Sequence, residues 1–179
     1  MTDKRKVKKK SFHDDELNAG STFSNPFKIV SGVRALILKI QSVGNGARDV
    51  WICQQSTDWD NNRSWWDSYT PALELLEEIE RFLSSNPFEI LTLILEDCVG
   101  ASNGLVKVFE AARLTKYLFP LKKMPRNGGD WPSVKDMAAA NQRLIVFTSN
   151  ISKEESEGIA YTWNFMVECK CEKIDKQYI

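Results

Sequence analysis

The pattern of apolar and polar positions is most regular in residues 70–96, where a helical period gives way to a continuous apolar run. Within residues 71–86, apolar side chains recur at helical spacing and acidic side chains occupy the other face, which predicts an amphipathic helix. Thr70 is suited to cap this helix. Asn86 favours its end, because a residue that precedes proline is biased toward extended backbone. Residues 90–95 are apolar on both faces, which is typical of a parallel strand in a sheet covered by helices on both sides.

The remaining elements follow from shorter patterns. We expect strands at 33–40, 50–54 and 143–148, helices from Asn103 and at 134–140, an irregular loop at 56–69, and a weaker element at 160–167. Strands that alternate with helices predict an α/β fold, and this order suits one half of a parallel (β/α) barrel. A complete barrel takes about 250 residues, more than the 179 of this chain. We therefore expect a partial TIM-like barrel whose uncovered sheet edge permits self-association.

Composition and charge limit the classes of protein to which the chain can belong. A chain of 179 residues with 42% hydrophobic content can form one domain with its own core, and it has no apolar run of the ~18 residues that a membrane span requires. The formal net charge is zero, but the first ten residues hold six of the 24 basic side chains and one acid, which leaves −5 on the rest. Residues 1–26 are therefore predicted to be a basic, disordered segment, with nuclear import or peripheral contact with an anionic membrane as alternatives. No aromatic residue is interleaved with these lysines, so we expect no nucleic-acid partner.

Several short features bear on the compartment of the chain. No apolar core follows the N-terminal lysines as it would in a secretory signal peptide, so the chain as written predicts a cytoplasmic protein. Two tripeptides match the acceptor pattern for N-glycosylation, at Asn62 and Asn150, which would matter only in a secreted protein. Four cysteines are too few and too irregularly spaced for a disulfide framework, so we expect reduced thiols at Cys53, Cys98, Cys169 and Cys171.

Eight short blocks carry a more specific pattern. They are residues 32–36 (GVRAL), 50–53 (VWIC), 86–90 (NPFEI), 95–97 (LED), 103–105 (NGL), 127–132 (NGGDWP), 141–144 (NQRL) and 157–161 (EGIAY). In this order they resemble the X domain of plant-type phosphatidylinositol-specific phospholipase C proteins, over about residues 29–167. The resemblance implies a PLC-like phosphodiesterase fold, with a half barrel at 27–168 and a C-terminal tail at 169–179. It also implies lipid metabolism, in a family whose members are often secreted or membrane-anchored.

Catalysis in this family implies two proton-transfer groups. The inositol 2-hydroxyl attacks the neighbouring phosphorus, so a general base must take its proton and a general acid must protonate the leaving glycerol oxygen. The resemblance implies histidines in both roles, but the chain has one histidine, His13, and no Thr-His-Asn/Asp-Ser motif. Gln54 stands where the second histidine is expected, and glutamine exchanges no proton near neutral pH. His13 is the alternative base.

Three charged residues are candidates for binding phosphate or a metal. Lys39 stands where calcium-dependent members of the family carry aspartate and metal-independent bacterial members carry arginine, so it is expected to bind phosphate and to repel calcium. Glu96 matches a family calcium ligand, and the alternative that we favour is an ion pair with Lys39. Arg34 either binds phosphate as well or forms a structural salt bridge. We therefore expect no cofactor, with calcium at Glu96 as the alternative.

The sequence supports two functions. The first is a phosphoric diester hydrolase that acts on phosphoinositide-type lipids. The second is a catalytically inactive relative that binds phosphoinositide headgroups or a protein partner, and Gln54 and the missing first motif favour it. In either case, the tryptophans Trp51, Trp65 and Trp66 line a lipid-facing mouth or pack their own loop.

Overall fold

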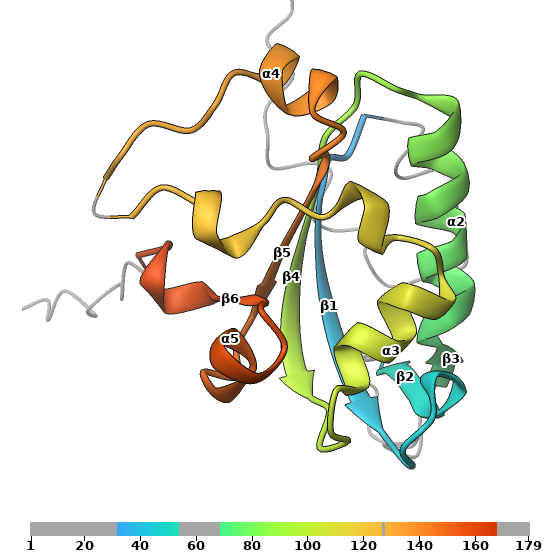
Figure 1. The fold of residues 1–179 in the computed structure, drawn as a ribbon. Coiled ribbons are helices and arrows are strands. Elements are labelled where there is room, and N and C mark those ends of the chain that lie inside the picture. The colour runs from blue at the N-terminus through green and yellow to red at the C-terminus, as the bar shows by residue number, and fades with distance from the viewer. Residues whose placement is uncertain (1–31, 54–68, 127, 168–179) are drawn as a thin grey trace, which may run out of the picture.

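A six-stranded mixed sheet organises residues 32–53, 69–126 and 128–167, the parts of the chain that the computed structural model describes (Figure 1). Its strands are β1 (Ala35–Ser42), β2 (Val50–Cys53), β3 (Tyr69–Pro71), β4 (Leu91–Cys98), β5 (Leu144–Thr148) and β6 (Ala160–Tyr161), in the order β3-β2-β1-β4-β5-β6. The α-helices are α2 (Ala72–Ser85), α3 (Gly104–Ala111), α4 (Val134–Ala139) and α5 (Ser152–Ser156), and 3-10 turns occur at Ala47–Asp49, Thr115–Tyr117, Leu121–Lys123 and Thr162–Asn164. The predicted α/β class is confirmed, and the described sheet is open, as expected for a partial barrel.

The direction of the strands departs from the expected parallel half barrel in one place. β1, β4, β5 and β6 are parallel neighbours, whereas β2 runs antiparallel to β1, and β3 antiparallel to β2. Residues 43–49 connect β1 to β2. A connection this short closes a hairpin, because a crossover between parallel strands needs about a dozen residues or more. The parallel part of the sheet therefore runs from β1 through β4 and β5 to β6.

Helix α2 forms where the sequence predicted it, with a different N-terminal cap. Its apolar stripe is buried, at Ala72, Leu75, Leu76, Ile79 and Leu83. At its C-terminus, Asn86 donates from its backbone N–H and from its side-chain Nδ2 to the Phe82 carbonyl, at 3.0 and 2.8 Å. The prediction that Thr70 caps the helix was wrong, because Thr70 lies in β3 and Pro71 occupies the N-cap position. The extended backbone of β3 thus continues directly into the helix.

The two faces of the sheet are covered differently. Helices α2 and α3 pack on one face (Figure 1), where Leu38 of β1 and Leu93 of β4 are 2% and 0% exposed. On the other face, Phe147 of β5 is buried against the ring of Phe165, whereas Ile37 of β1 is 61% exposed. Within the described residues, the predicted cover of the second face is therefore found over β5, where Phe147 shares an apolar cluster with Met137 of α4, and not over β1. Burial alternates along β1 because only one of its faces is closed.

A polar cluster joins α2 to the 3-10 turn at Thr115–Tyr117. Glu80 Oε1 accepts hydrogen bonds from Lys116 Nζ and Ser84 Oγ, both at 2.9 Å, and Ser84 Oγ also lies 2.9 Å from Tyr117 Oη. Glu80 is buried, although it is part of a strongly acidic helix. The hydrogen bonds from Lys116 and Ser84 lower the pKa of Glu80.

Replacing Glu80 by glutamine should therefore remove a pH-dependent part of the stability. A carboxyl group whose pKa is lower in the folded chain stabilises the fold above its unfolded pKa, and this contribution is lost as the pH falls through the folded pKa. The wild type should lose its advantage over Glu80→Gln below the ordinary glutamate pKa of about 4.3. Urea unfolding from neutral pH down to about 3 measures the difference across this range. A difference that is constant with pH would contradict the expectation.

Candidate functional site

The C-terminal ends of β1, β4 and β5 meet at one edge of the sheet, because these strands are parallel neighbours. Functional side chains gather at this edge in parallel α/β sheets. β1 ends at Ser42, β4 at Cys98 and β5 at Thr148. Successive side chains point to opposite faces of a strand, so the edge carries two separate groups of residues. One group faces the open side of the sheet and the other faces α2 and α3.

On the open side, residues of neighbouring strands form successive rows. The strand register places Ile37 beside Ile94, and Lys39 beside Glu96. The Cys53 thiol of β2 extends the second row: burial raises its pKa, and the nearby charge of Lys39 acts in the opposite direction. Cys53, Lys39 and Glu96 are referred to below as the polar row. An apolar row, Ile37 and Ile94, lies two residues earlier along the same strands. The charged residues are therefore nearer to the C-terminal edge of the sheet.

Lys39 and Glu96 do not form the ion pair that we expected. Both side chains are exposed, and although they are register partners, no ion pair joins them within the part of the chain that the structure describes. An exposed pair is worth only about 0–1 kcal/mol, which the entropy of holding two long side chains can cancel. Lys39 is therefore an exposed lysine of the open face that makes no ion pair with its register partner.

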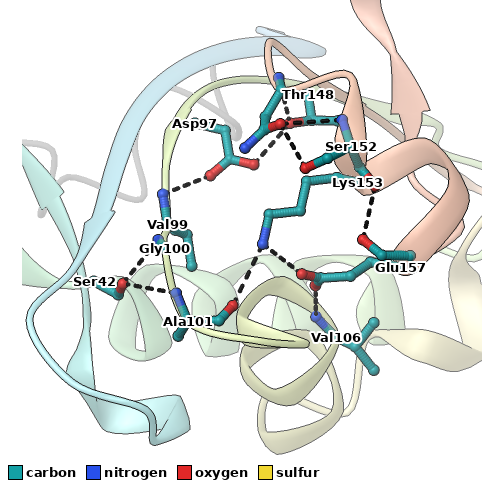
Figure 2. Close-up of polar contacts among 12 residues, drawn as sticks. Ser42, Asp97, Val99, Gly100, Ala101, Val106, Thr148, Ser152, Lys153 and Glu157 are labelled. Carbon is teal, nitrogen blue, oxygen red and sulfur yellow. Dashed lines mark hydrogen bonds and ion pairs between the residues drawn. The ribbon is translucent and has the colours of Figure 1, made fainter.

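Asp97 belongs to the other face and has a structural role. Its Oδ1 accepts from the Val99 N–H and its Oδ2 from Thr148 Oγ1, both at 2.8 Å (Figure 2). The Asp97 N–H donates to Ser149 Oγ, also at 2.8 Å. The residue is only 9% exposed. Asp97 thus ties the ends of β4 and β5 together, while Glu96, its neighbour in sequence, remains on the open face.

A buried ion pair at α5 was not predicted. Lys153 Nζ lies 2.5 Å from Glu157 Oε1, and the two side chains are 7% and 1% exposed (Figure 2). Lys153 Nζ also donates to the Ala101 carbonyl, at 3.4 Å. Glu157 Oε2 accepts from the Val106 N–H in the first turn of α3, at 3.0 Å. A carboxylate is favourable at a helix N-terminus, and this one supplies a bond that the N-cap residue Asn103, in the left-handed region at φ 53°, does not.

Ser42, the last residue of β1, forms hydrogen bonds with the loop that follows β4. Ser42 Oγ accepts from the N–H groups of Gly100 and Ala101, at 3.1 and 3.3 Å (Figure 2). Since the Val99 N–H is bound to Asp97, three consecutive amides of this loop are bonded within the protein. A phosphate at this edge would therefore have to be held by side chains rather than by this loop.

A sequence profile of the family described as PI-PLC X, for phosphatidylinositol-specific phospholipase C, matches residues 14–179. The chain belongs to the PI-PLC X family. PI-PLC X domain-containing protein At5g67130 of Arabidopsis thaliana is 44% identical over 151 residues, which are 84% of this chain and 34% of that protein. The chain thus spans about a third of the length of this relative. The identification from the eight sequence blocks is confirmed, and the match extends beyond 29–167 at both ends.

Two solved structures of the phosphatidylinositol-specific phospholipase C of Staphylococcus aureus are also similar to the chain. One was determined for work on membrane binding by that enzyme, and it gives a TM-score of 0.41 at 11% identity, over 69% of this chain and 37% of that one. The other is a mutant of the same enzyme, with a TM-score of 0.39 at 13% identity and the same coverage of both chains.

The arginine of the PI-PLC X motif lies away from the polar row. Arg34 precedes β1, and its Nε donates to Glu89 Oε2 at 2.6 Å. This hydrogen bond lowers the pKa of Glu89. The guanidinium group also stacks over the Phe82 ring, with its Cζ 5.1 Å from the ring centroid. Arg34 and Lys39 are thus not brought together, and phosphate binding by Arg34 stays a prediction.

Several candidate residues lie outside the described parts of the chain. These are Gln54, His13, Trp65 and Trp66, so their predicted roles stay predictions. Trp51 is described, and it lies half-buried in β2. Among the described residues, no group of three or more His, Cys, Asp or Glu side chains is placed to hold a metal ion. None of the described helices is long and apolar enough to cross a membrane.

Proposed function

We propose that this PI-PLC X chain binds the phosphorylated headgroup of an inositol lipid through Lys39, with little or no turnover. The observation that carries the proposal is the position of Lys39. It is exposed in the polar row, near the C-terminal edge of the sheet, and it forms no ion pair with Glu96. An ammonium group has three N–H donors for phosphate oxygens and forms charge-assisted hydrogen bonds with them.

Slow turnover is expected from the residue types that the chain carries. Cleavage needs one group that takes a proton and one that gives a proton. Gln54 can do neither near neutral pH, and His13 is the one histidine in the sequence. Each missing proton-transfer group lowers the rate roughly 100- to 10,000-fold. Binding of a headgroup needs neither group, and the charge of Lys39 makes a calcium ion beside it unfavourable.

Replacing Lys39 by alanine should weaken the binding of inositol 1-phosphate about 10- to 100-fold, because a hydrogen bond to a charged group contributes about 1.5–3 kcal/mol. Calorimetric titration of the purified chain measures this change. Lys135→Ala is the matched control, since Lys135 is an exposed lysine on α4, and it should bind like the wild type. Equal affinities for the wild type and Lys39→Ala would contradict the proposal.

Vesicles extend the same test from the soluble headgroup to a lipid surface. The basic residues 1–10 attract any anionic membrane, so phosphatidylinositol vesicles are compared with phosphatidylserine vesicles of equal charge. A preference for phosphatidylinositol that disappears in Lys39→Ala supports headgroup recognition. Equal binding to both lipids would indicate charge attraction alone.

Phosphodiester hydrolysis is the second candidate function, and membership of the PI-PLC X family favours it. It is tested by incubating phosphatidylinositol with the folded chain, with and without calcium. We expect no turnover above background in either condition. Clear turnover that is lost in Lys39→Ala would replace the binding proposal with an enzyme whose acid and base are not the expected histidines.

A further inference from the structure

One of the two glycosylation tripeptides lies within the described residues. Residues 150–152 read Asn-Ile-Ser and connect β5 to α5, at the C-terminal edge of the sheet. Ile151 is 66% exposed, and Ser149 and Ser152 are exposed as well. The tripeptide therefore reaches the surface, with a half-buried Asn150 between exposed neighbours, as a glycan acceptor requires.

Of the two polar side-chain atoms of Asn150, only the oxygen Oδ1 forms hydrogen bonds in the described part of the chain. Its Oδ1 accepts from the Ser152 N–H at 3.1 Å and from Ser152 Oγ at 2.8 Å, which is an Asx turn closed by the hydroxyl group of the same tripeptide. A backbone N–H can only donate, so the atom that faces it must be the oxygen. The amide nitrogen Nδ2 consequently points elsewhere.

Asn150 Nδ2 has no hydrogen-bond partner in the described part of the chain. No hydrogen bond from this nitrogen is found there, and no described side-chain nitrogen or oxygen is both buried and without a partner, so Nδ2 is in contact with solvent although Asn150 as a whole is half-buried. The Asn150 backbone is fixed separately, because its N–H donates to Thr148 Oγ1 at 3.1 Å and its carbonyl accepts from the Lys153 N–H at 3.1 Å. A substituent on Nδ2 breaks none of these bonds.

We propose that Asn150 accepts an N-linked glycan when the chain passes through a compartment that contains oligosaccharyltransferase. The donor is a lipid-linked oligosaccharide pyrophosphate. The bond between the sugar C1 and the pyrophosphate oxygen breaks, a bond between C1 and Nδ2 forms, Nδ2 loses one proton, and the lipid pyrophosphate leaves. Oδ1 keeps both of its hydrogen bonds to Ser152, so the turn that begins α5 is preserved. The glycan stands beside the ends of β4 and β5 that Asp97 joins.

The proposal is tested with the full chain expressed behind a cleavable secretory leader in eukaryotic cells. The secreted protein should lose mass on treatment with peptide-N-glycosidase, and mass spectrometry should locate the glycan on the peptide that contains Asn150. Asn150→Gln and Ser152→Ala should abolish this modification, and Ser152→Thr, which keeps the hydroxyl group, should retain it. Asn62→Gln removes the other tripeptide and should leave the glycan at Asn150 in place.

Two results would overturn the proposal. One is a secreted chain in which Asn150 is unmodified, whatever the state of Asn62. The other is a glycan that mass spectrometry places on the Asn62 peptide alone, because the modification would then bypass Asn150. The glycan is read directly by mass, so a variant that folds poorly still gives an answer.

Discussion

Replacing Lys153 by methionine is expected to lower the free energy of unfolding by about 3–5 kcal/mol, because it leaves a buried carboxylate without its counter-ion. The Glu157 side chain is 1% exposed, so water cannot take the place of the lysine. Methionine is similar in length and apolar, so the change removes the charge with little loss of packing. Urea unfolding at neutral pH measures the effect.

Two further variants separate the charge from other consequences of this change. Lys135→Met makes the same replacement at an exposed position on α4, and it should stay within about 0.5 kcal/mol of the wild type. The double variant Lys153→Met with Glu157→Gln removes both charges and keeps an acceptor for the Val106 N–H, so it should recover part of the lost stability. A loss in Lys153→Met no larger than in Lys135→Met would contradict the burial of the pair.

Asp97 and Glu96 should respond very differently to alanine, although they are adjacent in sequence. Asp97→Ala leaves the Val99 N–H and the Thr148 hydroxyl without an acceptor and is expected to cost about 3 kcal/mol. Glu96→Ala removes an exposed side chain from the open face and should change stability by less than about 0.5 kcal/mol.

Asp97→Asn provides a check on the same pair of hydrogen bonds. Asparagine keeps one acceptor oxygen, so Asp97→Asn should lower the free energy of unfolding, but by less than Asp97→Ala does. Urea unfolding of the three variants measures these differences. Similar losses for Glu96→Ala and Asp97→Ala would contradict the assignment of the two carboxylates to opposite faces.

The elements with long, regular patterns were predictable from the sequence, and the direction of the strands was not. Helix α2 and strand β4 were found because their apolar periods extend over many residues and a proline separates them. Apolar periodicity is the same for a parallel and an antiparallel strand, so the reversal of β2 was missed. The short connection at 43–49 was the signal that could have revealed it.

The sequence predicted which residues of the candidate site lie close together, but it did not predict the contacts that they make. The expected ion pair placed Lys39 and Glu96 near each other, and the register makes them neighbours although no ion pair forms between them. Glu96 and Asp97 are adjacent in sequence, but the alternation of side chains along a strand puts them on opposite faces. The buried pair of Lys153 and Glu157 was missed because a lysine and a glutamate four residues apart are typical of an exposed helix. Their burial depends on the loop after β4, which the local pattern does not reveal.

The bond between Glu157 and the Val106 N–H has a consequence for the order in which the chain can be completed. The two residues are 51 positions apart, and the acceptor is the later one to be synthesised. Until residue 157 has left the ribosome, the Val106 N–H lacks this native acceptor. The pairing of β1 with β4 requires nothing beyond residue 98 and can form earlier. A nascent chain can therefore align β1 with β4 before the N-terminus of α3 gains this bond, which forms only when Glu157 arrives next to α5.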